Sequence, residues 1–205
     1  RVPYVISGSG KTVPEDTGTY PKSALVTTDT EIESQSMVDY LCSCGHKRIA
    51  FITSGDEGLG RCHLNGYKRS LEKNGLEYDE KLIIRLKPGK RIYTIENGYN
   101  CTCELLKSGV DFSCIYAISD TLAVGACRAV IDSGKRVPED YCVAGADGQD
   151  IAEYYHPSIT TLKYPRVEIA LQSVRTLFDL INRKKVVKRQ ILGGTLIERE
   201  STRKL

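Results

Sequence analysis

Short runs of apolar residues alternate with longer segments of helical periodicity along most of this chain. The apolar runs predict strands at 2–6, 24–27, 48–53, 82–86, 112–117, 141–145 and 159–162, with a last strand near 190–197. The periodic segments predict helices at 32–44, 64–74, 97–108, 121–133 and 165–183. Apolar strands separated by helices are typical of βαβ units, in which helices cover both faces of a parallel sheet. The pattern therefore predicts an α/β fold.

Capping residues mark the ends of the first expected helix. Asp29 is placed to accept amide hydrogen bonds at its start, and Gly45 follows its end, where glycine commonly terminates a helix. Residues 7–22 are rich in Gly, Ser, Thr and Pro and are expected to form a loop.

The segment Gly8-Ser9-Gly10-Lys11-Thr12 resembles part of a phosphate-binding loop. That motif requires a glycine five residues before its Gly-Lys pair, where this chain has Val5, and a helix that starts at the lysine. The residues that follow have the composition of a loop. We therefore do not expect nucleotide hydrolysis.

Composition and charge fit a globular protein without a nucleic-acid-binding face. Among 205 residues, 40% are hydrophobic and 7% aromatic, which is enough for a sizeable core. The 29 basic and 26 acidic residues give a net charge of only +3, and the basic run at 183–189 has the character of a solvated turn. No apolar run approaches the roughly 20 residues of a membrane span, so no membrane partner is expected.

The eight cysteines do not form the pattern of a disulfide framework or a metal site. Cys114, Cys127 and Cys142 lie in apolar runs, where cysteine behaves as a small hydrophobic residue. The two C-x-C pairs, at 42–44 and 101–103, lie on expected helices, where residues two apart point to different sides. We expect no metal, and without a signal peptide at the start of the chain we expect a reducing cytoplasm.

No catalytic constellation is recognisable in the chain. There is no G-x-G-x-x-G after a strand, no G-x-S-x-G and no H-E-x-x-H, and the three histidines have no triad partners around them. We expect neither an enzyme nor a cofactor.

Polar and aromatic residues instead follow the carboxyl ends of several expected strands. In a parallel α/β sheet these ends meet at one edge, where ligands bind. A few directional hydrogen-bonding groups with an aromatic wall suit a small polar molecule. The residues in question are Glu57, Arg61, His63, Tyr93, Ser119, Asp120 and Asp147.

Two signatures carry a resemblance to a known family. Residues 45–52 read GHKRIAFI, and residues 196–202 read LIEREST. Both are similar to segments of the effector-binding domain of bacterial repressors of the lactose and galactose repressor type, and the resemblance extends over about 2–202. It implies a two-lobed, periplasmic-binding-protein-like (type I) fold with the effector between two α/β lobes. Three chain crossings are then expected near 44–46, 158–161 and 192–194.

The resemblance also implies how the chain is divided. Residues 1–46 would be a remnant of the N-terminal lobe and 47–158 a nearly complete C-terminal lobe. Residues 159–191 would return to the first lobe as the long helix, and 192–205 would form the closing strand and tail. The opening βαβ units of the incomplete lobe and the helix-turn-helix are then missing, so operator DNA is expected as a partner only through an absent N-terminal headpiece.

The function implied is that of the effector-binding and dimerisation part of a cytoplasmic transcriptional regulator. A homodimer is expected through helices 97–108 and 121–133. The alternative is a periplasmic-type sugar-binding protein of a transport system, which has the same two-lobed fold. The cysteine content and the ending Arg199-Glu200-Ser201-Thr202 argue against it.

Several residues match effector-binding positions of the family. Asp147, in the segment VAGAD, matches an acid that hydrogen-bonds effector hydroxyls or a ring nitrogen, with loop capping as its alternative role. Tyr93 matches an aromatic that stacks on the effector, or is an exposed loop tyrosine. Asp29 also matches an acid of the family, but helix capping is its favoured role. Ser119 stands where asparagine is usual, and Asp120 is favoured as an anchor of its helix.

The main departure from the family is His63, which stands where relatives carry an effector-clamping arginine; Arg61 is two positions away. Replacing a five-donor guanidinium by an imidazole changes which ligands the site can hold. We expect a pocket of Tyr93, Asp147, His63 and Ser119, with Glu57 or Arg61 at its rim, for a small polyhydroxylated compound. The imidazole is expected to add a pH dependence near neutrality.

Overall fold

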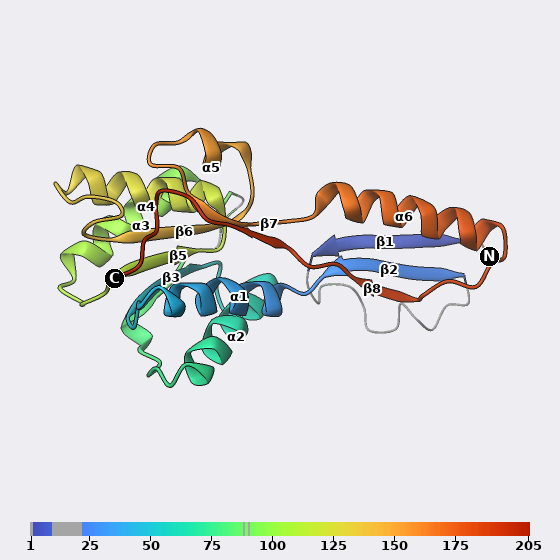
Figure 1. The fold of residues 1–205 in the computed structure, drawn as a ribbon, viewed down its shortest axis with the longest axis horizontal. Coiled ribbons are helices and arrows are strands. Elements are labelled where there is room, and N and C mark those ends of the chain that lie inside the picture. The colour runs from blue at the N-terminus through green and yellow to red at the C-terminus, as the bar shows by residue number, and fades with distance from the viewer. Residues whose placement is uncertain (1, 10–21, 88, 90) are drawn as a thin grey trace.

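The chain folds into two lobes of unequal size joined at a narrow waist (Figure 1). The computed structural model describes residues 2–9, 22–87, 89 and 91–205. Most of the loop expected at 7–22, including Lys11 and Thr12 of the phosphate-loop-like segment, lies outside the described residues.

A six-stranded sheet forms the centre of the larger lobe. Its order is β4 (Ile83–Arg85), β3 (Ile49–Thr53), β5 (Cys114–Ala117), β6 (Cys142–Asp147), β7 (Thr160–Lys163) and β9 (Thr195–Ile197). All neighbouring pairs are parallel except β7 and β9. The strands β3 and β5 are buried at every position, which explains why they are continuous apolar runs without alternation.

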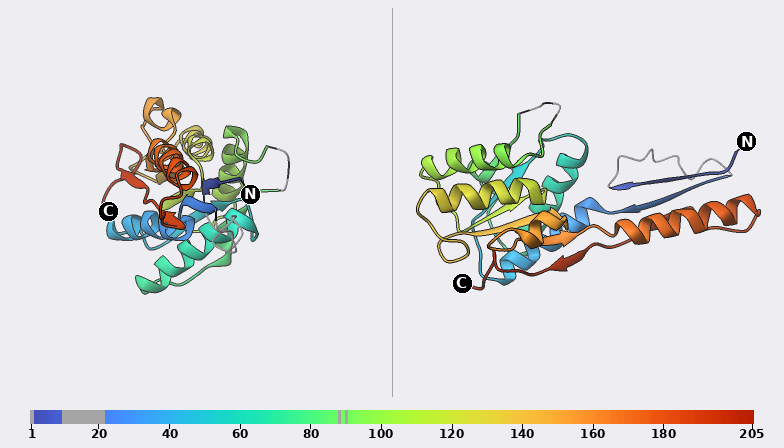
Figure 2. Two further views of the ribbon diagram at one scale, coloured as in Figure 1. Left: turned by 90° about the vertical axis from the view of Figure 1, so that its right-hand side faces the viewer. Right: turned by 90° about the horizontal axis from the view of Figure 1, so that it is seen from above.

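Helices cover both faces of this sheet, as the sequence pattern predicts. Figure 2 shows α1 (Thr30–Ser43) and α2 (Gly58–Lys73) on one side, and α3 (Ile95–Lys107) and α4 (Asp120–Asp132) on the other. The short helix α5 (Asp150–Tyr154) packs on α4, and a 3-10 turn, η3 (Glu80–Leu82), precedes β4. The ring of Phe51 on β3 is stacked with Tyr67, at 4.9 Å between centroids, and with Tyr116, at 5.2 Å.

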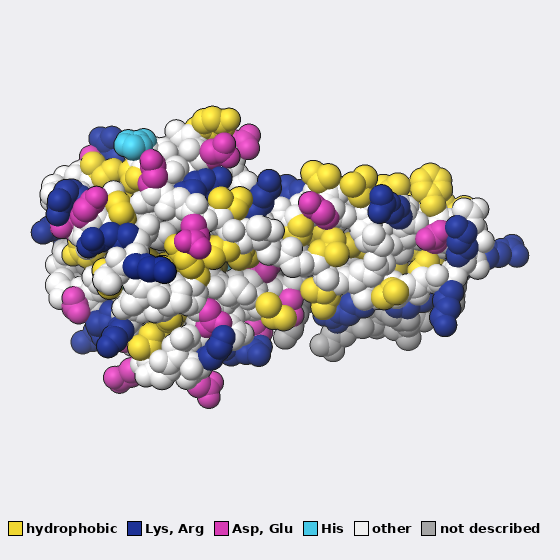
Figure 3. All heavy atoms as spheres, viewed as in Figure 1, with side chains coloured by type: hydrophobic (Ala, Val, Ile, Leu, Met, Phe, Trp, Pro, Cys, Tyr) yellow, Lys and Arg dark blue, Asp and Glu magenta, His cyan; other side chains and the backbone are white. Residues whose placement is uncertain are grey.

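In the part of the smaller lobe that the structure describes, there are one helix and a three-stranded sheet. Strands β1 (Tyr4–Ser9), β2 (Ser23–Thr28) and β8 (Arg189–Ile191) are parallel, and α6 (Arg166–Ile181) packs on β1 and β2. The outer face of α6 is apolar and exposed, as the side chains along its upper edge in Figure 3 show. Its apolar residues recur at helical spacing and are 52–66% exposed: Val167, Leu171, Val174, Phe178 and Ile181.

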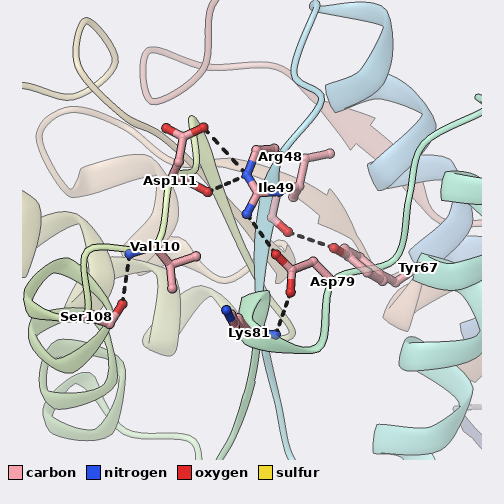
Figure 4. A network of polar contacts seen from close by, with 8 residues as sticks. All are labelled: Arg48, Ile49, Tyr67, Asp79, Lys81, Ser108, Val110 and Asp111. Atoms are coloured by element: carbon pink, nitrogen blue, oxygen red, sulfur yellow. Dashed lines mark hydrogen bonds and ion pairs between the residues drawn. The ribbon is translucent and has the colours of Figure 1, made fainter.

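An ion pair ties loops to the amino end of β3, on the edge of the sheet away from the waist (Figure 4). Arg48 lies 2.8 Å from the Asp79 carboxylate, and its Nε donates to the carbonyl oxygen of Asp111 at 2.7 Å. Beside it, the Tyr67 hydroxyl donates to the Ile49 carbonyl at 2.8 Å. These bonds hold the loops before β4 and β5 against the strand between them.

The expected elements are found, with three differences. The strand that starts the chain continues to Ser9, whereas residues 7–9 were expected in a loop. Helix α2 begins at Gly58, so Arg61 and His63 lie on a helix and not in a loop. The strand expected at 190–197 is two strands in different sheets, β8 and β9, broken at 192–194, where a crossing between lobes was expected.

The position of α1 also differs from the division expected from the sequence. We expected it in the smaller lobe, but it packs mainly against α2 and also contacts β7. Its buried face, with Met37, Val38 and Leu41, belongs to the core of the larger lobe. The chain therefore leaves the smaller sheet before α1, and returns to it between β7 and α6.

None of the helices in the described ranges combines the length and the apolar character needed to cross a membrane.

Close packing of α3 on α4 generates the first prediction. An added Cβ at Gly125 would overlap the carbonyl oxygen of Ile95, and one at Gly98 would overlap that of Leu122. Gly125→Ala should therefore push the helices apart and lower the free energy of unfolding by about 1–3 kcal/mol. Denaturant titration measures this change.

The matched control is Gly193→Ala, because a Cβ at Gly193 meets nothing within 4 Å. That substitution should stay within about 0.5 kcal/mol of the parent protein. Equal effects of the two substitutions would show that the helix contact does not require glycine.

Candidate functional site

A cavity of about 130 Å³ lies at the carboxyl ends of the larger sheet, beside the crossing to the smaller lobe. This is the edge at which ligands bind to parallel α/β sheets. The volume is below the roughly 300 Å³ at which pockets for drug-sized molecules begin, so its occupant is small. The lining residues come from α1, α2, α4 and the ends of β5, β6 and β7, and from the loop after β4: Thr30, Glu33, Leu59, His63, Tyr93, Tyr116, Ser119, Ala146, Asp147, Leu162 and Tyr164.

The amino-terminal ends of two helices meet at this cavity. Asp29 caps α1 by accepting the amides of Glu31 and Ile32, which leaves Thr30 and Glu33 in the first turn on the cavity side. Ser119 caps α4 and accepts the amide of Leu122 at 3.3 Å. Such helix ends carry partial positive charge, which stabilises polar and acidic groups near them.

Asp147 lies in the wall of the cavity in a strained backbone conformation. It ends β6 with φ of 101°, in the left-handed region that residues other than glycine seldom adopt. Its carboxylate accepts a hydrogen bond from the Gln149 side-chain amide at 3.1 Å. Burial raises the pKa of Asp147, while Gln149 and the charge of Arg166 act in the opposite direction. Strain of this kind is concentrated at ligand-binding sites.

Glu33 brings a second carboxyl group to the same cavity. Burial raises its pKa to about 7, and the negative charges of Asp29 and Asp147 act in the same direction. The Thr28 hydroxyl donates to Oε2 at 3.0 Å and partly opposes the shift. Near neutral pH this carboxyl is therefore divided between its protonated and ionised forms.

The His63 imidazole also lines the cavity, but it does not titrate near neutrality. Burial lowers its pKa to about 4, so the ring is neutral throughout the physiological range. The expectation of a pH dependence carried by His63 is therefore wrong. The reason is that burial withholds water from the charged form of the ring. The backbone of His63 is held by α1, whose Ser34 hydroxyl donates to the His63 carbonyl at 2.8 Å.

Two more of the expected pocket residues line the cavity with His63 and Asp147. Tyr93, in the loop before α3, is 44% exposed, and Ser119 is buried at the start of α4. Four segments separated along the chain thus bring together the pocket of Tyr93, Asp147, His63 and Ser119. Their role toward a ligand remains a prediction.

Four expected residues do not line this cavity, namely Glu57, Arg61, Asp29 and Asp120. Glu57 is exposed at the capping position of α2 and makes no capping hydrogen bond. Arg61 is exposed and its Nε donates to the Asp56 carbonyl at 2.7 Å, so it does not replace the guanidinium that His63 lacks. Asp29 lines a neighbouring cavity of about 150 Å³ between α1 and residues 191–194, and its bonds are those of a helix cap.

Asp120 is an anchor beneath the site and does not line the cavity. It is fully buried, and it accepts hydrogen bonds from the Thr161 hydroxyl and from the Gln149 amide, each at 2.6 Å. Burial raises its pKa to about 6. These contacts hold the start of α4, β7 and the turn after Asp147 together.

Sequence reasoning missed four polar or aromatic residues of the cavity. Glu33 lies four residues after Asp29, hence on the same face of α1, which could have indicated it. Tyr164 follows the end of β7 as other site residues follow their strands, and its hydroxyl donates to the Gly8 carbonyl of the smaller lobe at 2.8 Å. Thr30 and Tyr116 gave no signal, because they lie in a helix start and in an apolar strand.

Known proteins resemble this chain over most of its length. Residues 38–202 match the family model of the periplasmic binding protein-like domain. The HTH-type transcriptional regulator MalR of Clostridium butyricum is 41% identical over 146 residues, which cover 71% of this chain and 42% of that protein. The regulator CelR of Thermobifida fusca is 32% identical over 98% of this chain and 56% of its own length. The chain spans about half the length of these curated relatives.

Solved structures show the same fold. The Escherichia coli transcriptional repressor AscG superposes with a TM-score of 0.81 at 28% identity, over 94% of this chain and 67% of the repressor. A complex of CelR with cellobiose superposes with a TM-score of 0.81 at 32% identity, over 98% of this chain and 59% of CelR.

The raised pKa of Glu33 predicts how stability depends on pH. The folded protein holds this proton up to about pH 7, whereas the unfolded chain releases it near 4.5, so rising pH through that window destabilises the fold. Glu33→Gln removes the effect. The free energy of unfolding of the variant minus that of the parent should therefore rise by about 1–3 kcal/mol from about pH 4 to pH 8.

Denaturant titrations at several pH values measure this difference. Asp120 and Asp147 are present in both proteins, so their contributions to the pH dependence largely cancel in the difference. Glu72→Gln is the matched control, because Glu72 is exposed on α2. If the free energy of unfolding relative to the parent does not change with pH in either variant, Glu33 is not buried as the structure shows.

Proposed function

The chain belongs to the periplasmic-binding-protein-like family of lactose-repressor-type transcriptional regulators, and from this we propose that it is the effector-sensing part of such a regulator. In the full protein, a small molecule in the cavity stabilises one arrangement of the two lobes and thereby changes how DNA-binding segments outside this chain are held. Such coupling requires that the molecule bind one arrangement more tightly than the other.

One observation carries the proposal: a cavity with buried polar groups lies where the two lobes meet. Glu33, Asp147 and His63 line it from the larger lobe, and Tyr164, at the return to the smaller lobe, bonds to Gly8. A ligand here contacts the segments whose relative position changes when the lobes close. The relatives named above are regulators, not enzymes or transport proteins, which supports action on operator DNA in the cytoplasm.

We propose a small hydroxylated compound of the carbohydrate class as the effector. Asp147 accepts hydrogen bonds from its hydroxyl groups, and Tyr93 covers an apolar face of its ring. CelR, which shares the fold, is solved with cellobiose, and this supports the carbohydrate class.

A thermal-shift screen with carbohydrates tests this proposal, because a ligand that binds only the folded state raises its melting temperature. Asp147→Asn should remove most of the shift given by any hit. Losing a hydrogen bond to a charged group costs about 1.5–3 kcal/mol, or about 10–100-fold in affinity. Asparagine tolerates the left-handed backbone at this position, so the melting temperature without ligand should change little.

Glu57→Gln is the control for the screen, because Glu57 lies outside the cavity. It should keep the full shift of the parent protein. An undiminished shift in Asp147→Asn would remove Asp147 from the site.

We also propose that the protein forms a homodimer through α3 and α4. A groove of about 420 Å³ between these helices is lined by Tyr99, Cys103 and Leu106, among others. Cys103→Arg should fill this groove with a long charged side chain and shift sedimentation toward the monomer, because removing that charge from water in a buried contact is costly.

Val187→Arg, at a 66% exposed position in the smaller lobe, is the matched control and should sediment as the parent does. A parent protein that remains monomeric at high concentration would contradict this assignment of the interface.

A further inference from the structure

The charges around the cavity are one-sided. Glu33 and Asp147 both line it, and no lysine or arginine of the described ranges does. Neither carboxyl group takes part in an ion pair within the part of the chain that the structure describes. His63, the remaining titratable nitrogen of the wall, is neutral.

Some buried polar atoms of residues that line the cavity have no hydrogen-bond partner among the described residues. Thr30, which is 3% exposed, has a buried hydroxyl with no hydrogen-bond partner among the described residues. The same holds for Nδ1 of His63. Both residues line the cavity. Buried polar groups are nearly always satisfied in folded proteins, so two such atoms beside one cavity indicate a polar occupant.

Three tyrosines complete the wall. Tyr93, Tyr116 and Tyr164 come from different segments and all line the cavity. Aromatic rings attract cations through their electron-rich faces, more strongly when water is excluded. Two carboxyl groups and several aromatic rings around a small cavity are the surroundings that a positively charged group prefers.

The amino-terminal ends of α1 and α4 bring partial positive charge to the cavity, but the charged side chains just outside it are mostly acidic. Arg166 at the start of α6 lies 5.9 Å from the Tyr164 ring, and its charge acts on Asp147. It faces a neighbouring groove and not the cavity. Asp29 on α1 and Asp120 on α4 add negative charge that acts on Glu33 and on Tyr116 respectively.

From this arrangement we propose that the cavity selects a hydroxylated ligand bearing a protonated amine, such as an amino sugar, held between Glu33 and Asp147. The assignment rests on the proposed effector site and narrows its ligand class. A neutral polyol satisfies the hydroxyl and imidazole but leaves the two carboxylates without a counter-charge. A phosphorylated or carboxylated compound adds repulsion to them.

Glu33 also gives the selectivity a pH dependence. Its pKa of about 7 in the empty site means that it is mostly protonated at about pH 6, and a cation must displace that proton. Binding of the protonated amine, with affinity referred to the protonated fraction of the compound at each pH, should therefore weaken by up to about tenfold from pH 8 to pH 6, whereas binding of a neutral polyol should not.

The test uses three small compounds that share a fully substituted central carbon with at least two hydroxymethyl groups and that differ in charge. Tris(hydroxymethyl)aminomethane is cationic, pentaerythritol is neutral, and 2,2-bis(hydroxymethyl)propionate is anionic. Calorimetric titration of the protein in phosphate-free HEPES should give at least about tenfold tighter binding of the amine than of pentaerythritol, and no binding of the propionate. Glucosamine against glucose repeats the comparison on a sugar ring.

Glu33→Gln should abolish the preference for the amine, while Glu72→Gln, an exposed acid on α2, should retain it. Equal or tighter binding of pentaerythritol and glucose, no binding of either amine, or an unchanged preference in Glu33→Gln would overturn the proposal.

The outcomes also separate this inference from the proposed function. If a neutral carbohydrate gives a thermal shift that Asp147→Asn removes while both amines fail, the ligand class is wrong and the effector site stands. If the amines bind through Glu33 but leave DNA binding by the full-length regulator unchanged, the cation site stands and the sensing role is wrong.

Discussion

The buried carboxylate of Asp120 holds together the segments on which the site depends. Its two oxygens accept the Thr161 hydroxyl and the Gln149 amide, each at 2.6 Å, so that α4, β7 and the turn after β6 meet at one point. That turn carries Asp147 in its left-handed conformation. A Cβ on Gly145 would overlap the Asp120 carboxylate, so glycine is required for this close approach. The geometry of the cavity thus rests on a buried carboxyl group that does not line it.

The C-terminal signature has a structural role of the same kind. The Ser201 hydroxyl donates to the Val143 carbonyl at 2.6 Å and accepts the Thr160 amide at 2.8 Å, and Glu200 accepts both the amide and the hydroxyl of Ser158. These bonds join the starts of β6 and β7, at the edge of the sheet opposite the cavity. The segment that resembles the family most readily therefore holds the fold together and does not line the cavity.

Local pattern was sufficient to predict most elements, because the strands of the larger sheet are buried on both faces and the helices between them are amphipathic. It failed at the start of α2, where two glycines and an uncapped Glu57 weaken the helical signal. The tertiary structure explains Gly60, since a Cβ there would overlap the Gly55 carbonyl oxygen. The close packing of α2 against the loop that carries Gly55 thus outweighs the low helix propensity of glycine at this position.

The sequence could predict only part of the site, because sheet topology places some of its residues and tertiary packing places the others. Tyr93, Ser119 and Asp147 follow strands whose ends must converge, so their positions follow from the topology of a parallel sheet. Glu33 and Thr30 depend on which lobe α1 joins, and the buried positions Met37, Val38 and Leu41 suit either core. Only the packing of α1 on α2 decides which lobe α1 joins, and a local sequence pattern does not reveal that contact.

The two lobes differ in how many apolar side chains they bury, and this difference affects how the proposed effector site could transmit a signal. The larger lobe has a continuous core through its sheet and five of its helices, whereas the described part of the smaller lobe buries few side chains, among them Leu25, Val26 and Ile169. Segments with fewer buried apolar contacts open and move at lower free energy. The cavity walls therefore belong to the rigid lobe, and the bond from Tyr164 to Gly8 reaches the lobe that moves more easily. A ligand bound to the first can then restrain the second without reshaping its own site.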